Sequence, residues 1–300
     1  MYNAVGDHMN YLLVFIADIL LALDFALQKK YQAGAGADIS AGLRFNMLNG
    51  LAAAVIFFAA AGFSFTFSAF SLLCAAGMAL CLIVYTLLGF WILREVNTAT
   101  YSVFLMSGGM LLPYIFGILV LNEELTLFRL IGIVIILIAI IMSANGKLRF
   151  RPKLIFLCVA VFLLNGMVSI ISKVHQVNAD YAPVSSTAFT VYANALKCLF
   201  SALALAFWKS RQKRGGPRKS LLHGKGLLLT VCFSAVLSGS SYLLQLTGAK
   251  MLPASVLYPL VTGGSIVMTA LAGKIFFKEK LGRAGWISIG LCLAGTLCFL

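Results

Sequence analysis

Two stretches of this chain repeat one pattern: ATYSVFLMSGGMLLPYIFGILVLNEE (residues 99–124) and ASVLYPLVTGGSIVMTALAGKIFFKE (residues 254–279). At a constant offset of 155 residues, Ser107-Gly108-Gly109 falls on Thr262-Gly263-Gly264, and the glutamates that end the two stretches coincide. Each stretch is followed by a leucine and then by one further apolar segment that contains glycine. Similarity at a fixed offset is the signature of an internal repeat, so the chain is predicted to consist of two related halves.

A second match lies near the start of each half. Gln28-Lys29 closes the first apolar stretch as Ser172-Lys173 closes the sixth, at an offset of 144 residues. The predicted domains are therefore residues 1–146 and residues 147–300, and each contains five apolar stretches.

The composition indicates that most of the chain lies in an apolar solvent. Of the 300 residues, 61% are hydrophobic and only 11% are charged, and the mean hydropathy is +0.99. A soluble domain is nearer to half apolar and about a quarter charged. We therefore predict a multi-pass protein of the cell (plasma) membrane that is in contact with membrane lipid.

Ten stretches approach the roughly 20 apolar residues with which a helix crosses a bilayer. Open sheets would leave backbone groups unpaired in lipid, so helices are the favoured solution. The predicted fold is an all-α membrane protein with ten transmembrane helices. The predicted spans are Tyr11–Gln28, Leu43–Ala61, Phe70–Leu93, Ala99–Leu121, Leu127–Asn145, Leu154–Ser172, Thr187–Phe207, Leu227–Leu246, Ala254–Phe277 and Gly282–Leu300.

An odd number of crossings in each half has a topological consequence. The second half must enter the membrane from the opposite side, which makes the halves inverted repeats around a pseudo-two-fold axis in the membrane plane. A site between such halves can be opened to either side, so alternating access to a small-molecule substrate is predicted. Because the two-fold lies within one chain, a monomer suffices, and a homodimer is the alternative.

The basic residues predict an orientation and argue against a nucleic-acid partner. The net charge is +14, but the Lys and Arg side chains lie in short gaps between apolar runs and form no amphipathic face. Of the 23 basic residues, 19 lie in the odd-numbered connectors, with the densest run at residues 209–225. By the positive-inside rule these connectors face the cytoplasm and both termini lie outside.

Several of these residues resemble a known family. The resemblance is carried by Leu246–Ser255, Pro259, Thr262-Gly263-Gly264 and Phe276–Leu281 in the second half, and by Arg44-Phe45, Leu121–Leu125 and Gly132 in the first. Together they resemble EamA-type members of the drug/metabolite transporter superfamily over nearly the whole chain. The resemblance implies ten helices, a central cavity between the halves, and export or uptake of amino acids, sugars or other metabolites. Many members of the family keep their termini in the cytoplasm, which is opposite to the orientation that the charges predict.

Among the charged residues of the predicted spans, Asp18 lies near the middle of the first span, Asp24 nearer its end, and Lys197 at the centre of the seventh. A charge at mid-membrane costs about 3 kcal/mol. Asp18 is predicted to face the cavity and to carry a proton or bind a cationic group of the substrate; the alternative is a structural contact with Lys197 or a polar group. For Asp24 the structural role is favoured, because Gln28 lies four residues further along the same helical face. For Lys197 a charge pair or a snorkelling side chain is favoured over contact with substrate.

Other residues at comparable depth could line a polar cavity or pack helices together. The glycine pairs allow close helix approach or a bend of the backbone toward a ligand, and the polar side chains could bond a substrate. The predicted lining consists of Asp18, Tyr85, Ser107, Gly108, Gly109, Asn165, Ser169, Tyr242, Gln245, Tyr258, Thr262, Gly263 and Gly264. Glu124 and Glu279 end two spans at opposite faces, where a structural role near loop backbone is predicted.

An enzyme is not expected, because HExxH, GxGD and GxSxG motifs are absent from the sequence. His8, His175 and His223 lie at or beyond the ends of predicted spans, and the seven cysteines form no CxxC pair, so neither a metal site nor a cofactor is predicted. Besides a metabolite transporter, two functions remain open: a lipid or polyprenyl-carrier flippase of the same fold, and a membrane scaffold that transports nothing.

Overall fold

The computed structural model describes residues 4–36, 38–64, 66–92, 98–143, 152–211, 224–278 and 282–299. Within these residues the chain forms ten α-helices and one short 3-10 helix, η1 (Ala179–Tyr181). The helices of the first half are α1 (Ala4–Ala35), α2 (Ile39–Ala60), α3 (Ala69–Ile92), α4 (Thr98–Leu119) and α5 (Leu127–Ser143). Those of the second half are α6 (Pro152–Val177), α7 (Ser186–Arg211), α8 (Gly224–Met251), α9 (Ala254–Phe277) and α10 (Arg283–Leu297).

Each predicted span falls on one helix, and α9 has the predicted bounds. Several helices are longer than hydropathy alone predicts. α1 extends beyond both ends of the predicted span, and α2 begins at Ile39 instead of Leu43. α6 continues past Ser172 to Val177, α7 past Phe207 to Arg211, and α8 past Leu246 to Met251. The extension of α6 carries three buried polar residues, Lys173, His175 and Gln176. Tertiary packing of this kind stabilises helix that the local pattern does not predict.

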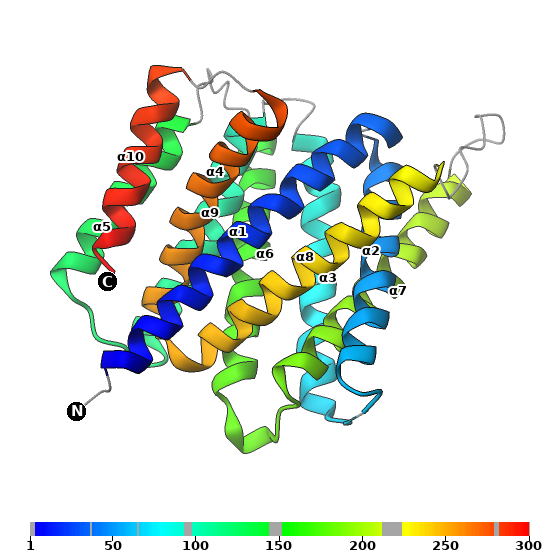
Figure 1. The fold of residues 1–300 in the computed structure, drawn as a ribbon, viewed down its shortest axis with the longest axis horizontal. Coiled ribbons are helices and arrows are strands. Elements are labelled where there is room, and N and C mark those ends of the chain that lie inside the picture. Colours follow the sequence, from blue (N-terminus) through cyan, green and yellow to red (C-terminus); the bar gives the residue numbers. More distant parts are fainter. Residues whose placement is uncertain are drawn as a thin grey trace.

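Successive helices run in opposite directions across the bundle (Figure 1). The connectors α2–α3, α4–α5, α6–α7 and α8–α9 lie along the lower edge of Figure 1, and the ends of α1, α7 and α9 lie along the upper edge. Those upper ends carry Lys29, Lys30, Lys209, Arg211 and Lys274. The described basic residues are therefore concentrated at one edge of the bundle.

Helices that are five positions apart in the chain have corresponding packing partners in the opposite half of the chain. α1 packs on α8 and α9, and its counterpart five helices later, α6, packs on α3 and α4. α2 packs on α7, α5 on α10 and α4 on α9, so that each of these helices contacts its own counterpart. α5 and α10 are also the shortest of these helices, with 17 and 15 residues, and they lie together at one side of the bundle (Figure 1).

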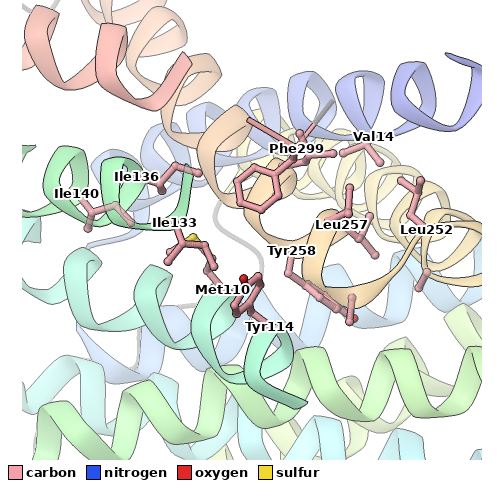
Figure 2. Packing of buried hydrophobic residues seen from close by; sticks show 14 residues of the cluster. Val14, Met110, Tyr114, Ile133, Ile136, Ile140, Leu252, Leu257, Tyr258 and Phe299 are labelled. Carbon is pink, nitrogen blue, oxygen red and sulfur yellow. The ribbon is translucent and has the colours of Figure 1, made fainter. Parts of the chain in front are cut away.

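The largest apolar cluster joins α1, α4, α5 and α9 with the end of α8 and the C-terminal residues (Figure 2). At its centre Met110 and Tyr114 of α4 lie beside Tyr258 of α9 (Figure 2). All three side chains are almost completely buried. This cluster fixes the contact between the two helices that carry the repeated glycine pairs.

The outer surface of the bundle is apolar, as α5 illustrates. Its exposed face carries Leu130, Ile131, Val134, Ile138 and Ile141, a row at helical spacing, while the opposite face is buried. Such a surface requires lipid or another apolar partner.

Seven described helical segments are long and apolar enough to cross a membrane: Met9–Ala35, Ile39–Ala60, Ala69–Gly89, Pro152–Val177, Ser186–Arg211, Gly226–Met251 and Ala254–Phe277. Three shorter apolar segments are Phe104–Leu119, Leu127–Met142 and Arg283–Leu297. The all-helical, multi-pass class is confirmed, and ten crossings remain a prediction.

Candidate functional site

α6 places a row of polar groups against three other helices. Asn165, Ser169 and Ser172 are spaced four and three residues apart, which puts them on one helical face. The Nδ2 atom of Asn165 donates to the carbonyl oxygen of Leu105 in α4, at 2.7 Å. This contact ties the middle of α6 to the middle of α4.

The same row of α6 holds two tyrosines from the second half. The hydroxyl of Tyr258 in α9 donates to the carbonyl oxygen of Ser169, at 2.5 Å. The hydroxyl of Tyr242 in α8 lies 3.0 Å from the Oγ atom of Ser172. Four of the predicted lining residues therefore lie along one face of α6. Asn165 and Ser169 belong to α6 itself, and Tyr242 of α8 and Tyr258 of α9 contact this face.

The first glycine of each repeated pair packs against a neighbouring helix. A Cβ atom on Gly108 would lie 2.1 Å from the carbonyl oxygen of Phe162 in α6. A Cβ atom on Gly263 would lie 2.2 Å from the Cγ2 atom of Thr296 in α10. Gly108 and Gly263 therefore permit close helix contact, the packing role that was one of the two predicted for these pairs.

The second glycine of each pair instead faces a polar side chain. A Cβ atom on Gly109 would lie 2.6 Å from the Nδ2 atom of Asn165, and one on Gly264 would lie 2.0 Å from the Oδ2 atom of Asp18. The repeated stretches predict that α4 and α9 are counterparts, as are α1 and α6, and this relation would give Asn165 and Asp18 equivalent places in the two halves. Each side chain is held against the backbone of the other half.

Asp18 differs from Asn165 in what it can bond. The Asp18 side chain is 2% exposed, and its Oδ1 atom has no hydrogen-bond partner among the described residues. An amide can donate to a helix carbonyl, as Asn165 does, whereas an ionised carboxylate can only accept. A buried acceptor without a partner is costly, so Asp18 is suited to receive a proton or a cationic group.

Asp24 and Lys197 belong to a separate polar network that links four helices. The Nζ atom of Lys197 in α7 donates to the Oδ1 atom of Asn49 in α2, at 2.7 Å. The Nδ2 atom of Asn49 donates to the Oγ atom of Ser234 in α8, at 3.1 Å. Ser234 donates to the Oδ1 atom of Asp24 in α1, whose Oδ2 atom accepts from Gln28 at 2.7 Å.

The structural role favoured for Asp24 and the charge-pair role favoured for Lys197 both fit this network. Lys197 is joined to Asp24 through two neutral side chains, and the alternative contact between Lys197 and Asp18 is not the bond that the structure shows. Asn49 and Ser234 were not among the residues predicted from the sequence to have a role. The signal for Asn49 was available, because an amide in the middle of a predicted span normally has an interhelical partner.

The network predicts non-additive effects on stability. Asp24→Asn and Lys197→Met are each expected to lower the melting temperature of the purified protein, since each leaves a buried charge without its counter-charge. The double variant is expected to be more stable than the sum of the two losses predicts, by about 1 kcal/mol. Thermal unfolding in detergent measures this, and strictly additive losses would show that the two charges do not interact.

The remaining lining residues lie apart from the row on α6. Tyr85 packs in an apolar cluster of α3, α4 and α6, and Ser107 is buried in α4. Gln245 of α8 donates to Ser241 at 3.1 Å, and Ser241 donates to the carbonyl oxygen of Ala17, beside Asp18. The carbonyl oxygen of Thr262 accepts from Ser265 within α9.

The glutamate that meets loop and helix backbone is Glu123, which corrects the prediction for Glu124. Glu123 accepts from the backbone N–H groups of Ala254 and Ser255, at 2.6 and 2.7 Å. The backbone oxygen of the exposed Glu124 accepts from Arg129 at 3.1 Å. Adjacent residues in a turn point in different directions, so the sequence could not tell which of the two would reach α9. Glu279 lies outside the described residues.

His175 was expected at or beyond the end of a span, and the structure places it in the last turn of α6. It lies within α6 and is 0% exposed, with its Nε2 atom 2.9 Å from the Oγ atom of Ser71 and its Nδ1 atom 2.8 Å from the Nε2 atom of Gln176. Its ring stacks on that of Phe189, with centroids 3.6 Å apart. Both ring nitrogens are satisfied, which is typical of a structural histidine. His8 lies in the part of α1 whose side chains are not described, and His223 lies outside the described residues.

This chain is similar to known membrane transport proteins. Residues 152–300 match the EamA-like transporter family. A stretch of 64 residues, 21% of this chain, is 42% identical to 57% of the spermidine export protein MdtI from Shigella flexneri. A stretch of 109 residues, 36% of this chain, is 28% identical to 87% of the probable 4-amino-4-deoxy-L-arabinose-phosphoundecaprenol flippase subunit ArnE from Hamiltonella defensa subsp. Acyrthosiphon pisum (strain 5AT).

The chain spans little more than half the length of the first of these relatives, MdtI. A crystal structure of a protein with 16% sequence identity superposes with a TM-score of 0.74, over 97% of this chain and 96% of the other. At that identity the likeness shows a shared fold only.

Proposed function

Because the chain belongs to the EamA-like transporter family through residues 152–300, we propose that it moves a small metabolite across the cell membrane by alternating access. The substrate binds between two five-helix repeats, residues 1–146 and 147–300. The observation that carries the proposal is Asp18, a buried mid-helix carboxylate held against α9 of the other half with one oxygen unpartnered. The proposed activity is transport, which requires no covalent chemical step.

Four further features support the inverted repeat. Counterpart helices exchange their packing partners, which is expected of a pseudo-two-fold axis. α9 comes five helices after its counterpart α4, so the two run in opposite directions (Figure 1). The family match begins at residue 152, close to the start of the proposed second repeat. The two curated relatives are also much shorter than this chain, since 64 residues are 57% of one and 109 residues are 87% of the other.

The substrate class that the site favours is a small molecule with a cationic amine. Asp18 offers an acceptor that an ammonium group would satisfy, and a relative is a spermidine export protein. Tyr258 and Asn165 could orient the remainder of such a molecule through hydrogen bonds. The basic edge of the bundle would face the cytoplasm and both termini would lie outside.

The second candidate function is a flippase for a lipid-linked carrier, because the relative ArnE is named as a flippase subunit. The two functions differ in what the protein must accommodate. A metabolite transporter encloses its substrate between the halves, whereas a flippase must leave a long acyl or prenyl chain in the bilayer.

Reconstitution separates these candidates. Purified protein in liposomes is expected to accumulate radiolabelled spermidine or another amine when a pH gradient is applied, and a thermal-shift screen of amines, amino acids and sugars is expected to show a stabilising ligand. Inversion of a labelled lipid headgroup without solute flux would favour the flippase. If neither solute flux nor headgroup inversion is observed, a membrane scaffold that transports nothing is the remaining function. Light scattering of the same preparation would distinguish a monomer from a homodimer.

A further inference from the structure

Glu123 binds the start of α9 with both carboxylate oxygens. Asn122 adopts a left-handed conformation (φ 54°) just beyond α4, which asparagine tolerates better than most residues. The chain then turns back, so that the N–H of Glu123 bonds to the carbonyl oxygen of Gly117 at 3.0 Å. This turn brings the carboxylate to the N–H groups of Ala254 and Ser255.

Those two N–H groups have no acceptor within their own helix, because the first turn of a helix leaves its donors free. Val256 and Leu257, the next residues, bond to the carbonyl oxygen of Pro253. Glu123 thus accepts from both of these donors, and its negative charge meets the positive end of the α9 dipole.

Lys173 binds the end of α8 in the complementary way. Its Nζ atom donates to the carbonyl oxygens of Ala249 and Leu252, at 2.8 and 2.6 Å. The side chain is 4% exposed, and its positive charge meets the negative end of the α8 dipole. The elbow between α8 and α9 (Leu252-Pro253) is therefore held by opposite charges on its two sides.

The contacts of Glu123 tie the two halves together at one edge. Glu123 belongs to the first half, whereas Lys173, α8 and α9 belong to the second. The elbow and the α4–α5 connector lie at the lower edge of the bundle, away from the basic ends of α1, α7 and α9 (Figure 1).

The repeat counterpart of Lys173 is in a different environment. Lys29, at the offset of 144 residues, is exposed at the end of α1, with its Nζ atom 4.5 Å from the ring centroid of Phe277. One lysine is buried and bonded to helix carbonyls while its counterpart at the other edge is exposed. Two lysines at equivalent places of the repeat but in unequal environments are what an inverted-repeat transporter closed at one face predicts.

We propose that Glu123 and Lys173 form a latch that closes the protein at the α8–α9 edge, and that the latch releases when this edge opens during transport. The inference rests on the proposed alternating access. In the closed state the carboxylate holds the start of α9 and the ammonium holds the end of α8. Weakening either contact shifts the population toward the state that is open at this edge.

Hydrogen–deuterium exchange of the purified full-length protein in lipid nanodiscs tests the latch without a substrate. In Glu123→Ala, exchange at the Ala254 and Ser255 amides is expected to rise at least about tenfold, because their acceptor is removed. Exchange at the ends of α1 and α9 at the opposite edge is expected to slow, since opening one face closes the other. Lys173→Met is expected to produce the same pair of changes.

The chain supplies a matched control for each variant. Glu124→Ala removes the adjacent, exposed glutamate, and Lys29→Met removes the counterpart lysine; neither is expected to raise exchange at Ala254 and Ser255. Faster exchange confined to these two amides, with no slowing at the opposite edge, would reduce the latch to a local helix cap and overturn the proposal. A reciprocal change without flux of any tested solute would leave the latch intact and count against the proposed substrate instead.

Discussion

Asp18→Asn is expected to reduce solute flux into proteoliposomes by about 30-fold or more, while the protein continues to fold and insert. The substitution keeps the size of the side chain and removes the charge that a cationic substrate or a proton would neutralise. Since the Oδ1 atom has no partner in the described structure, the variant removes a buried, uncompensated charge that costs free energy. Its melting temperature is therefore expected to stay level or rise.

Lost flux together with retained stability would show that Asp18 acts in transport and is not needed for folding. Asp180→Asn, an exposed position in η1, is the control and is expected to transport at the parental rate. Flux should be measured with and without a pH gradient, because a carboxylate that carries the proton makes the parental protein, and not the variant, respond to the gradient. Undiminished proton-coupled uptake by Asp18→Asn would remove this residue from the mechanism.

Gly108→Ala is expected to destabilise the protein by about 3 kcal/mol, because the added methyl group overlaps backbone and not a side chain that could move. The Cβ atom would lie 2.1, 2.7 and 2.8 Å from the carbonyl oxygen, carbonyl carbon and Cα of Phe162. Gly166 of α6 lies opposite, and a Cβ atom there would be 2.7 Å from the carbonyl oxygen of Gly108. The crossing of α4 and α6 thus depends on the absence of both side chains.

A drop in melting temperature of roughly 5–10 °C in detergent is the expected readout for Gly108→Ala. Gly290→Ala in α10 is the matched control, because a Cβ atom there meets nothing within 4 Å. It is expected to leave the melting temperature unchanged or to raise it slightly, since alanine is the better helix former. Equal melting temperatures for the two variants would show that α4 and α6 do not cross this closely.

The glycine pairs show how far the sequence could specify the site. Their repetition at a constant offset predicted that α4 and α9 are counterparts, and the observed packing exchange is consistent with it. The sequence left packing and lining as alternatives for the whole pair. The structure assigns packing to Gly108 and Gly263 and a polar neighbour to Gly109 and Gly264, because neighbours on a helix point about 100° apart and so face different partners.

The all-helical class and the multi-pass membrane setting were readable from the sequence, as were the order and approximate bounds of the helices. These properties follow from hydropathy summed along the chain and from local propensity, and neither depends on which distant residues meet. Only the tertiary structure decided the polar contacts: that Glu123 and not Glu124 reaches α9, that Lys173 and His175 are buried within α6, and that Asn49 and Ser234 connect Lys197 to Asp24. Such contacts depend on the rotation and depth of each helix against its neighbours, and these are fixed only when all the helices pack together.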